Sequence, residues 1–82
     1  MKNIVFTKRS WGEYVYWQQQ NIKTAQKINA LLRSILREGV LSGEGKPEKL
    51  KYRPEDYSRR IDSENRLVYL VSNNEVIVKS CK

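Results

Sequence analysis

The amino-acid sequence predicts one α+β domain with the element order β-α-α-β-β-β-β, in which two N-terminal helices pack on one face of an antiparallel twisted sheet. Three observations predict this fold class. Two amphipathic segments follow one another near the N-terminus, so the helices come together and do not alternate with strands. Four short β-prone runs come after them, joined by turns too short for parallel crossovers. The chain has 82 residues, a length typical of one domain, and we expect that domain to cover residues 1–82.

The first part of the chain predicts a strand and then a helix. Residues 2–7 are rich in β-branched and aromatic side chains, which favour extended backbone. Ser10 and Glu13 have the spacing of a capping box, in which a hydroxyl accepts from a backbone N–H at the helix start and a carboxylate reaches back. We therefore expect Ser10 to cap a helix over residues 11–20, where aromatic side chains recur at helical spacing.

The second helix has the clearest pattern. Thr24 is its expected N-cap, and Gly39 is its expected end because glycine tolerates the backbone angles that terminate helices. The apolar stripe that should face the sheet consists of Ile28, Leu31, Leu32, Ile35 and Leu36. The opposite side is expected to hold Lys27, Arg33, Ser34, Arg37 and Glu38.

A loop rich in glycine, over residues 43–47, separates the helices from the strand region. Clusters of Pro, Asp, Ser and Asn then interrupt the β-prone runs, and connections this short join antiparallel neighbours. The four strands expected after the loop cover residues 48–52, 57–62, 66–72 and 75–81.

Charge and composition narrow the partners and exclude several kinds of site. Lys and Arg number 16 against 9 Asp and Glu, a formal net charge of +7, which favours an anionic partner such as RNA, DNA, a membrane surface or an acidic protein. Histidine is absent and Cys81 is the only cysteine, so an internal disulfide is excluded, and neither a metal site nor a cofactor is expected. No apolar run is long enough for a membrane span or a signal peptide, so we expect a cytoplasmic protein.

Basic side chains concentrate in the C-terminal half and are expected to form one RNA-binding surface. Strand alternation would place Lys49, Lys51 and Arg53 on one side of their strand. The other cations expected near this surface are Lys46, Arg59, Arg60, Arg66, Lys79 and Lys82. Tyr52, Tyr57 and Tyr69 lie between them, and tyrosine rings stack on bases. The alternative is a solvated basic face whose tyrosines serve only for packing.

These residues indicate how RNA could be cleaved without a metal. Such a reaction uses the RNA's own 2′-OH as nucleophile and needs a base, cations around the phosphate and an acid for the leaving oxygen. Glu48 is the only carboxylate at the head of the basic strands, so it is the candidate base, while Arg66 and Arg60 are candidate phosphate clamps. No residue stands out as the acid. The alternative for Glu48 is a surface ion pair with its lysine neighbours.

Five stretches of the sequence, in order along nearly the whole chain, match the motifs of a known family. The S-W-x-x-Y-x-Y-W motif corresponds to residues 10–17, K-I-N to 27–29, G-x-G-K-P-E-x-L-K to 43–51, W-S-R-R-I to 57–61 and E-H-R-L-V-Y to 64–69. On these motifs the chain resembles the YoeB/Txe toxins of the RelE superfamily, which belong to type II toxin–antitoxin systems.

The resemblance implies a RelE-like fold and a ribosome-dependent endoribonuclease that cleaves mRNA in the A site of the 70S ribosome and inhibits translation. It also implies neutralisation by a cognate YefM-type antitoxin with a disordered tail. The toxin–antitoxin complex would bind operator DNA and repress its own operon. A homodimer of the toxin is compatible with the resemblance. By position, Glu48 corresponds to the family's general base and Arg66 to its transition-state arginine. Arg60 and Lys51 correspond to supporting phosphate and rRNA contacts.

The chain departs from the family pattern at three places. Asn65 stands where the family has His, and Tyr57 where it has Trp; we expect both changes to be mild. The family also ends with a His and then a Tyr shortly after the position of Lys82, and the sequence contains no histidine. That His is the family's general acid, and the Tyr helps to hold the substrate base. We therefore expect the catalytic C-terminal tail to be missing and cleavage by these 82 residues to be impaired.

Two other functions remain open on the sequence alone. A non-catalytic module of the same fold would bind an antitoxin or the ribosome without chemistry, and the absent histidine favours it. A DNA-binding repressor is disfavoured because both helices carry core-facing stripes, which leaves no evident recognition helix.

Overall fold

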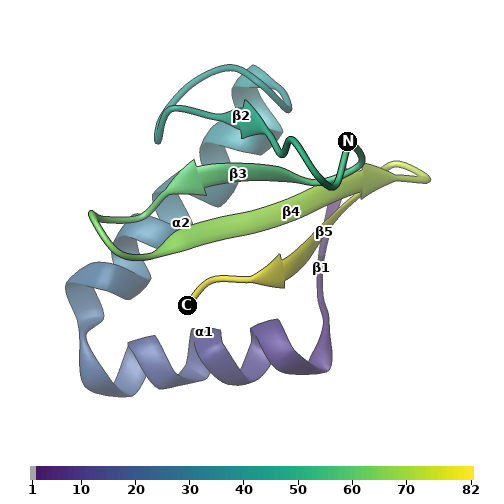
Figure 1. Cartoon of the computed structure of the whole chain (residues 1–82). Helices are drawn as coiled ribbons and strands as arrows, with labels where there is room; N and C mark the ends of the chain where they lie inside the picture. Colours follow the sequence, from purple (N-terminus) through teal and green to yellow (C-terminus); the bar gives the residue numbers. More distant parts are fainter. Residues whose placement is uncertain (1) are drawn as a thin grey trace.

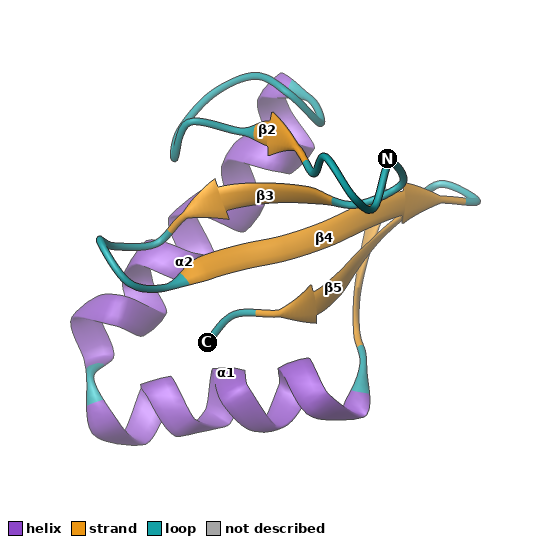
Figure 2. Ribbon diagram, in the orientation of Figure 1, coloured by secondary structure: helices purple, strands orange, loops and turns teal. Residues whose placement is uncertain are grey.

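Two helices cover one face of a five-stranded sheet in the computed structural model of the chain, which describes residues 2–82 (Figure 1). This arrangement confirms the predicted fold class and element order (Figure 2). The elements are β1 (Asn3–Phe6), α1 (Lys8–Gln20), α2 (Ile22–Glu38), β2 (Glu48–Lys49), β3 (Tyr57–Arg60), β4 (Arg66–Ser72) and β5 (Glu75–Ser80).

The sheet is mixed, whereas the sequence predicted an antiparallel one. Its strand order is β1-β5-β4-β3-β2. The pairs β2–β3, β3–β4 and β4–β5 are antiparallel as expected, but β1 lies parallel to β5 with Asn3 opposite Glu75 and Phe6 opposite Val78. Short turns impose antiparallel pairing only on the strands that they join. β1 is followed by the two helices and not by a short turn. The direction of β1 relative to its neighbour β5 is therefore not set by a turn.

Both helices begin at different caps from those predicted. Thr7 caps α1: its hydroxyl accepts from the Ser10 backbone N–H at 3.1 Å, and the Ser10 hydroxyl accepts from the Thr7 N–H at 2.9 Å. Ser10 is therefore the third residue of the helix and not its cap. Asn21 caps α2, because its side-chain oxygen accepts from the Thr24 backbone N–H at 3.3 Å. The predicted end of α2 at Gly39 is confirmed.

β2 is much shorter than the predicted strand over residues 48–52. The chain leaves the sheet after Lys49, and a loop over residues 50–56 is closed by a hydrogen bond of 2.9 Å from the Leu50 N–H to the Asp56 carbonyl. The predicted alternation of Lys49, Lys51 and Arg53 along one strand face is therefore wrong. The Asp56 carboxylate is buried against Lys79 of β5, and this contact draws the loop out of the strand path.

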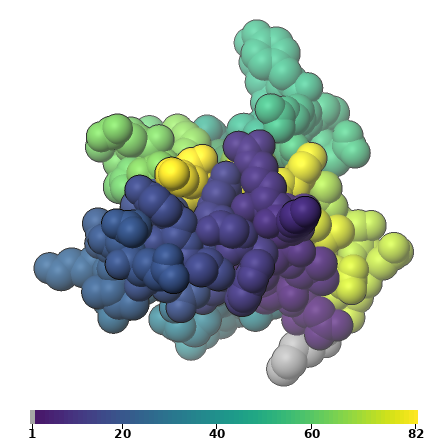
Figure 3. Space-filling model, turned by 90° about the horizontal axis from the view of Figure 1, so that it is seen from below, coloured from purple at the N-terminus to yellow at the C-terminus, as the bar shows by residue number. Residues whose placement is uncertain are grey.

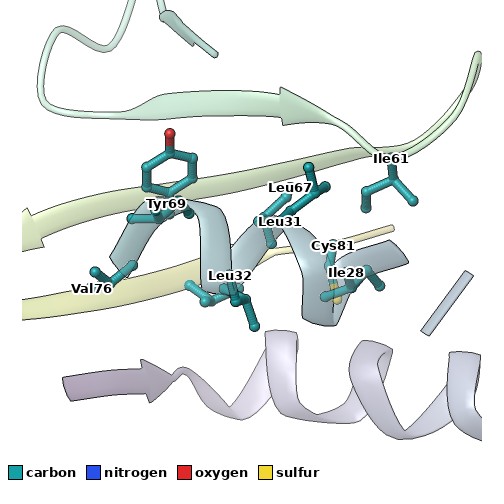
Figure 4. Close-up of a cluster of buried hydrophobic side chains, with 10 residues drawn as sticks. Ile28, Leu31, Leu32, Ile61, Leu67, Tyr69, Val76 and Cys81 are labelled. Carbon is teal, nitrogen blue, oxygen red and sulfur yellow. The ribbon is translucent and has the colours of Figure 1, made fainter. Parts of the chain in front are cut away.

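The core lies between α2 and the sheet face that both helices cover (Figure 4). Alternate side chains of β4 and β5 point into it, as strand geometry requires. Leu36, predicted to belong to the helix stripe, is 42% exposed, whereas Ser34 is buried. The buried apolar cluster consists of Ile28, Leu31, Leu32, Ile35, Ile61, Leu67, Tyr69, Val76, Val78 and Cys81.

Candidate functional site

The predicted base and the predicted phosphate-binding arginine meet on the open face of the sheet. Leu67 and Tyr69 of β4 point into the core, so Arg66 points to the side that the helices leave uncovered. One guanidinium nitrogen of Arg66 donates to the Glu48 carboxylate at 3.0 Å and to the Ser58 hydroxyl at 3.3 Å. Three strands thus place Glu48, Ser58 and Arg66 side by side.

This ion pair can exchange readily with an incoming anion. The side chains of Arg66 and Glu48 are 42% and 58% exposed, respectively. An ion pair this open to solvent contributes at most about 1 kcal/mol. Arg66 can therefore leave Glu48 for a phosphate at little cost, which would free the carboxylate to accept a proton.

A second arginine lies directly opposite Arg66. Arg60 of β3 is its cross-strand partner, and both side chains are exposed. Like charges in opposite positions on neighbouring strands destabilise a sheet. Within residues 2–82, no carboxylate pairs with Arg60. A phosphate between Arg60 and Arg66 would neutralise both cations, so this edge of the open face is a candidate anion site.

Arg59 was predicted to bind RNA, and this prediction is wrong. Its side chain is fully buried, and every nitrogen of its guanidinium donates to the protein. The acceptors, at 2.6–3.4 Å, are the hydroxyls of Tyr69 and Ser34 and the main-chain oxygens of Gly39, Val40, Ser42 and Glu44. Arg59 instead holds the loop that follows α2.

That loop carries Lys46 and Glu48 towards the sheet, and it is fixed from inside. The Arg60 backbone N–H donates to the Gly45 carbonyl at 2.7 Å. Gly45 has a φ of +84°, and a Cβ there would lie 2.6 Å from a methyl carbon of Leu31, so the position requires glycine. The loop geometry thus depends on buried contacts that the sequence did not reveal, notably those of Ser34 with Arg59 and with the Glu44 backbone.

The remaining predicted cations are distributed unevenly. Lys46 and Lys49 flank Glu48 in sequence, and neither has a side-chain partner within residues 2–82. Lys51 lies in the loop after β2. The Lys82 ammonium lies 3.9 Å from the centre of the Tyr16 ring on α1, and Lys79 is paired with Asp56. The structure therefore brings Glu48 and Arg66 into contact, with Arg60 opposite Arg66, and engages Lys79 and Lys82 elsewhere.

The comparisons with known proteins decide the family. A sequence model described as the YoeB-like toxin of bacterial type II toxin–antitoxin systems matches residues 6–82. The chain belongs to the YoeB toxin family. Toxin YoeB of Synechocystis sp. is 42% identical over 80 residues, which span 96% of this chain and 92% of the relative. The resemblance found in the sequence is thereby confirmed, and the chain is a toxin of a toxin–antitoxin system.

Solved structures of YoeB toxins have the same fold. The YoeB dimer from Staphylococcus aureus is 50% identical with a TM-score of 0.94, and the match covers 99% of this chain and 94% of that one. A YoeB–YefM complex from the same organism is 51% identical with a TM-score of 0.93, covering 100% and 95%. The mixed sheet and the two packed helices are thus the fold of the family.

Much of the YoeB-like motif in α1 serves the structure. The Ser10 hydroxyl, which is fully buried, donates to the Val78 carbonyl at 2.7 Å. Glu13 accepts from the Cys81 backbone N–H at 2.8 Å, and the Trp17 indole N–H donates to the Cys81 carbonyl at 2.8 Å. Ser10 thus attaches α1 to β5, and Glu13 and Trp17 fix Cys81 just after it. Sequence reasoning assigned Glu13 to a cap because nothing local indicates a partner so distant in the chain.

The titratable groups with shifted pKa values do not supply a proton donor near neutral pH. Burial, with a smaller effect of the Glu13 carboxylate, raises the pKa of the Cys81 thiol to about 12. Burial also raises the pKa of Tyr69 against the opposing hydrogen bond from Arg59. Hydrogen bonds from the Asn65 side chain and then from backbone N–H groups lower the pKa of Asp62. The candidate site therefore contains a possible base and cations but no evident acid among residues 2–82.

Within residues 2–82, no cluster of three or more His, Cys, Asp or Glu side chains could hold a metal ion. No helix in that part of the chain is long and apolar enough to cross a bilayer.

Proposed function

We propose that this YoeB-family toxin cleaves mRNA in the A site of the 70S ribosome and so inhibits translation. The observation that carries the proposal is the contact of 3.0 Å between Glu48 and Arg66, with Arg60 directly opposite Arg66. A carboxylate beside two arginines on an open surface is suited to a phosphodiester flanked by a hydroxyl. Action on ribosomes would place the protein in the cytoplasm.

The chemistry is attack of the RNA's 2′-OH on the adjacent phosphorus. Arg66 moves from Glu48 to the phosphate, and Glu48 then removes the 2′-OH proton. The 2′-oxygen–phosphorus bond forms while the bond from phosphorus to the 5′-oxygen breaks, which gives a cyclic 2′,3′-phosphate and a free 5′-hydroxyl after protonation. Arg66 and Arg60 stabilise the charge that develops on the phosphate oxygens. Lys46, Lys49 and Lys51 bind phosphates on either side.

Glu48→Gln tests the base. In a version of the chain extended by the family's His-Tyr ending, we expect this change to lower mRNA cleavage on translating ribosomes by roughly 10²–10⁴-fold, the contribution of a general base. Primer extension maps the cleavage. Glu55→Gln is the matched control, because Glu55 is an exposed carboxylate in the neighbouring loop. An undiminished rate in the Glu48 variant would remove that residue from the role of base.

The proton for the leaving 5′-oxygen is the second point to test. Histidine, with a reference pKa near neutrality, is the usual proton donor at such sites, and these 82 residues contain none. We infer that the 82 residues alone cleave far more slowly than the same chain carrying the His-Tyr ending. Primer extension on ribosomes compares the two, with an appended Gln-Tyr ending as the control. Equal cleavage by all three versions would show that the added histidine has no role.

A YefM-type antitoxin is the proposed neutralising partner. The relatives from Staphylococcus aureus include a YoeB–YefM complex and a YoeB dimer. The net charge of +7 and the cations around Glu48 would attract an acidic segment that folds on binding. Such a segment over Glu48 and Arg66 would block access of RNA. The complex is then proposed to repress its operon through operator DNA, with the antitoxin supplying the DNA contact, and a toxin homodimer is a further assembly.

A non-catalytic module is the second candidate function. It is favoured by one observation, that the 82 residues include no histidine. Such a protein would bind the antitoxin or the ribosome with ordinary affinity and would leave mRNA intact even with the His-Tyr ending attached. The cleavage experiment on the extended chain therefore separates the two functions.

A further inference from the structure

The loop between β2 and β3, residues 50–56, presents an aromatic ring that the fold does not use. Tyr52 is 88% exposed, more than any other large hydrophobic side chain among residues 2–82. Figure 3 shows the green-teal part of the chain, near residue 50 on its colour bar, standing out from the rest of the surface. The other two tyrosines of the basic region differ: Tyr69 is buried, and Tyr57 is half-buried and stacked on it.

The exposure of Tyr52 is imposed by an ordered loop. The Leu50 N–H donates to the Asp56 carbonyl and the Asp56 N–H donates to the Arg53 carbonyl, both at 2.9 Å. The Asp56 carboxylate is buried at the base of the loop, where it lies 3.0 Å from Lys79 of β5 and 3.8 Å from Arg53. A loop closed at its base by two backbone hydrogen bonds and by the ion pairs of the buried Asp56 carboxylate holds Tyr52 away from the core.

Charge identifies the partner that suits this ring. The Lys51 ammonium lies 5.8 Å from the centre of the Tyr52 ring, and Lys49 and Arg53 lie on either side along the chain. A flat aromatic surface among cations matches a nucleic-acid base with its flanking phosphates, because bases stack on tyrosine while phosphates pair with lysine and arginine. Glu55 is the only exposed carboxylate in this loop.

We propose that Tyr52 stacks on an unpaired RNA base while Lys51 and Arg53 bind the neighbouring phosphates. The proposal rests on the proposed action on RNA and adds a contact beside the Glu48–Arg66 pair, since β2 leads from Glu48 directly into this loop. The base comes from one of two sources with the same chemistry: mRNA next to the cleaved bond, or ribosomal RNA.

The test compares Tyr52→Ala, Tyr52→Phe and Ile22→Ala in two binding assays. The first measures fluorescence anisotropy of a labelled, single-stranded 2′-O-methyl oligoribonucleotide. The second measures co-sedimentation with vacant 70S ribosomes. Neither probe can be cleaved by the proposed reaction, so binding is read independently of activity. Ile22→Ala is the control because it removes exposed apolar surface at the start of α2.

Tyr52→Ala is expected to weaken binding by roughly 5- to 150-fold, which corresponds to the loss of one stacked base. Tyr52→Phe keeps the ring and recovers most of that loss, while Ile22→Ala binds as the parent does. A loss with the oligonucleotide identifies mRNA as the source of the base, and a loss confined to ribosomes identifies ribosomal RNA. Thermal unfolding checks that each variant folds as the parent does.

Unchanged binding of Tyr52→Ala in both assays would overturn the proposal. So would a loss confined to antitoxin binding, because Tyr52 would then belong to a protein interface. The proposed function can fail while this proposal holds. In that case the parent chain with the His-Tyr ending does not cleave mRNA, yet Tyr52→Ala still weakens RNA binding. Conversely, Glu48→Gln should lower cleavage by the roughly 10²–10⁴-fold given above and leave the binding of both probes intact.

Discussion

Arg59 holds a positive charge in the protein interior, and no carboxylate among residues 2–82 pairs with it. Its neighbours are hydroxyls and main-chain oxygens, including those of Gly39 and Val40 just beyond α2. The last carbonyls of a helix carry a partial negative charge and lack partners within the helix. The guanidinium satisfies carbonyls of this kind while it gains electrostatic compensation. A lysine at this position could not span them, because its ammonium is a single point of contact.

Arg59→Met should therefore destabilise the fold. Methionine fills a similar volume but leaves the loop carbonyls without donors, so we expect the free energy of unfolding to fall by roughly 2–4 kcal/mol. Arg59→Lys should recover only part of that loss. Urea unfolding followed by circular dichroism measures both. Arg60→Met is the control: this exposed neighbour should change stability little, and a similar loss in both methionine variants would refute the structural role of Arg59.

The arginine pair also shows what residue-level reasoning could reach. Strand alternation requires that one of Arg59 and Arg60 faces the core. Charged side chains are expected at the surface, so both arginines were predicted to be exposed. A buried arginine needs hydrogen-bond acceptors, and only the tertiary structure shows where these are. The prediction that Glu48 and Arg66 act together came first from the chemistry of RNA cleavage, and the family motifs then assigned the same two residues by position. Their contact at 3.0 Å is consistent with it.

At the scale of elements, α1 is defined by partners that lie far along the chain. Helical periodicity was sufficient to predict the helix, and the spacing of Ser10 and Glu13 placed its cap at Ser10. In the structure Thr7 is the cap, and the Ser10 hydroxyl instead donates to the distant Val78 carbonyl. Local sequence carries no information about such a contact, so the cap was predicted three residues too late.

Trp17→Phe tests the attachment of α1 to the end of the sheet. Phenylalanine keeps most of the packing but lacks the N–H that donates to the Cys81 carbonyl. We expect the unfolding free energy to fall by about 1–2 kcal/mol and amide hydrogen exchange to quicken near Cys81. Trp11→Phe, at a more exposed position on the same helix, should alter neither. Equal effects of the two changes would indicate lost packing alone.

At the scale of the whole molecule, the cations predicted to bind RNA have different surroundings. Arg66 contacts Glu48, Arg60 lies opposite Arg66, and Lys46 and Lys49 flank Glu48 in the sequence, whereas Arg59, Lys79 and Lys82 are used within the protein. Net charge alone therefore overstates the number of phosphates that the toxin can bind. The sequence was sufficient to predict the fold class, because its helical and strand periodicities agree with the elements of the structure. It was insufficient for the parallel β1–β5 pair, which no turn specifies.

The salt dependence of RNA binding measures the proposed RNA-binding surface as a whole. With about four to five phosphate contacts, the logarithm of the affinity for single-stranded RNA should fall with the logarithm of salt concentration with a slope of about −3. Lys49→Gln should make the slope shallower by about 0.7, the value of one contact. Lys23→Gln, on the exposed side of α2, should leave it unchanged. A slope near zero in the parent would contradict a phosphate-binding surface.

The position of β5 in the sheet has a consequence for biosynthesis. β5 is translated after the other four strands, yet it lies between β1 and β4 and pairs with both. A nascent chain that lacks β5 has a β1 without a partner and a core without Val76 and Val78. Contacts between segments so distant in sequence form slowly and together. The toxin therefore acquires its native sheet, and the surface that the sheet supports, only after the ribosome that makes it has released β5.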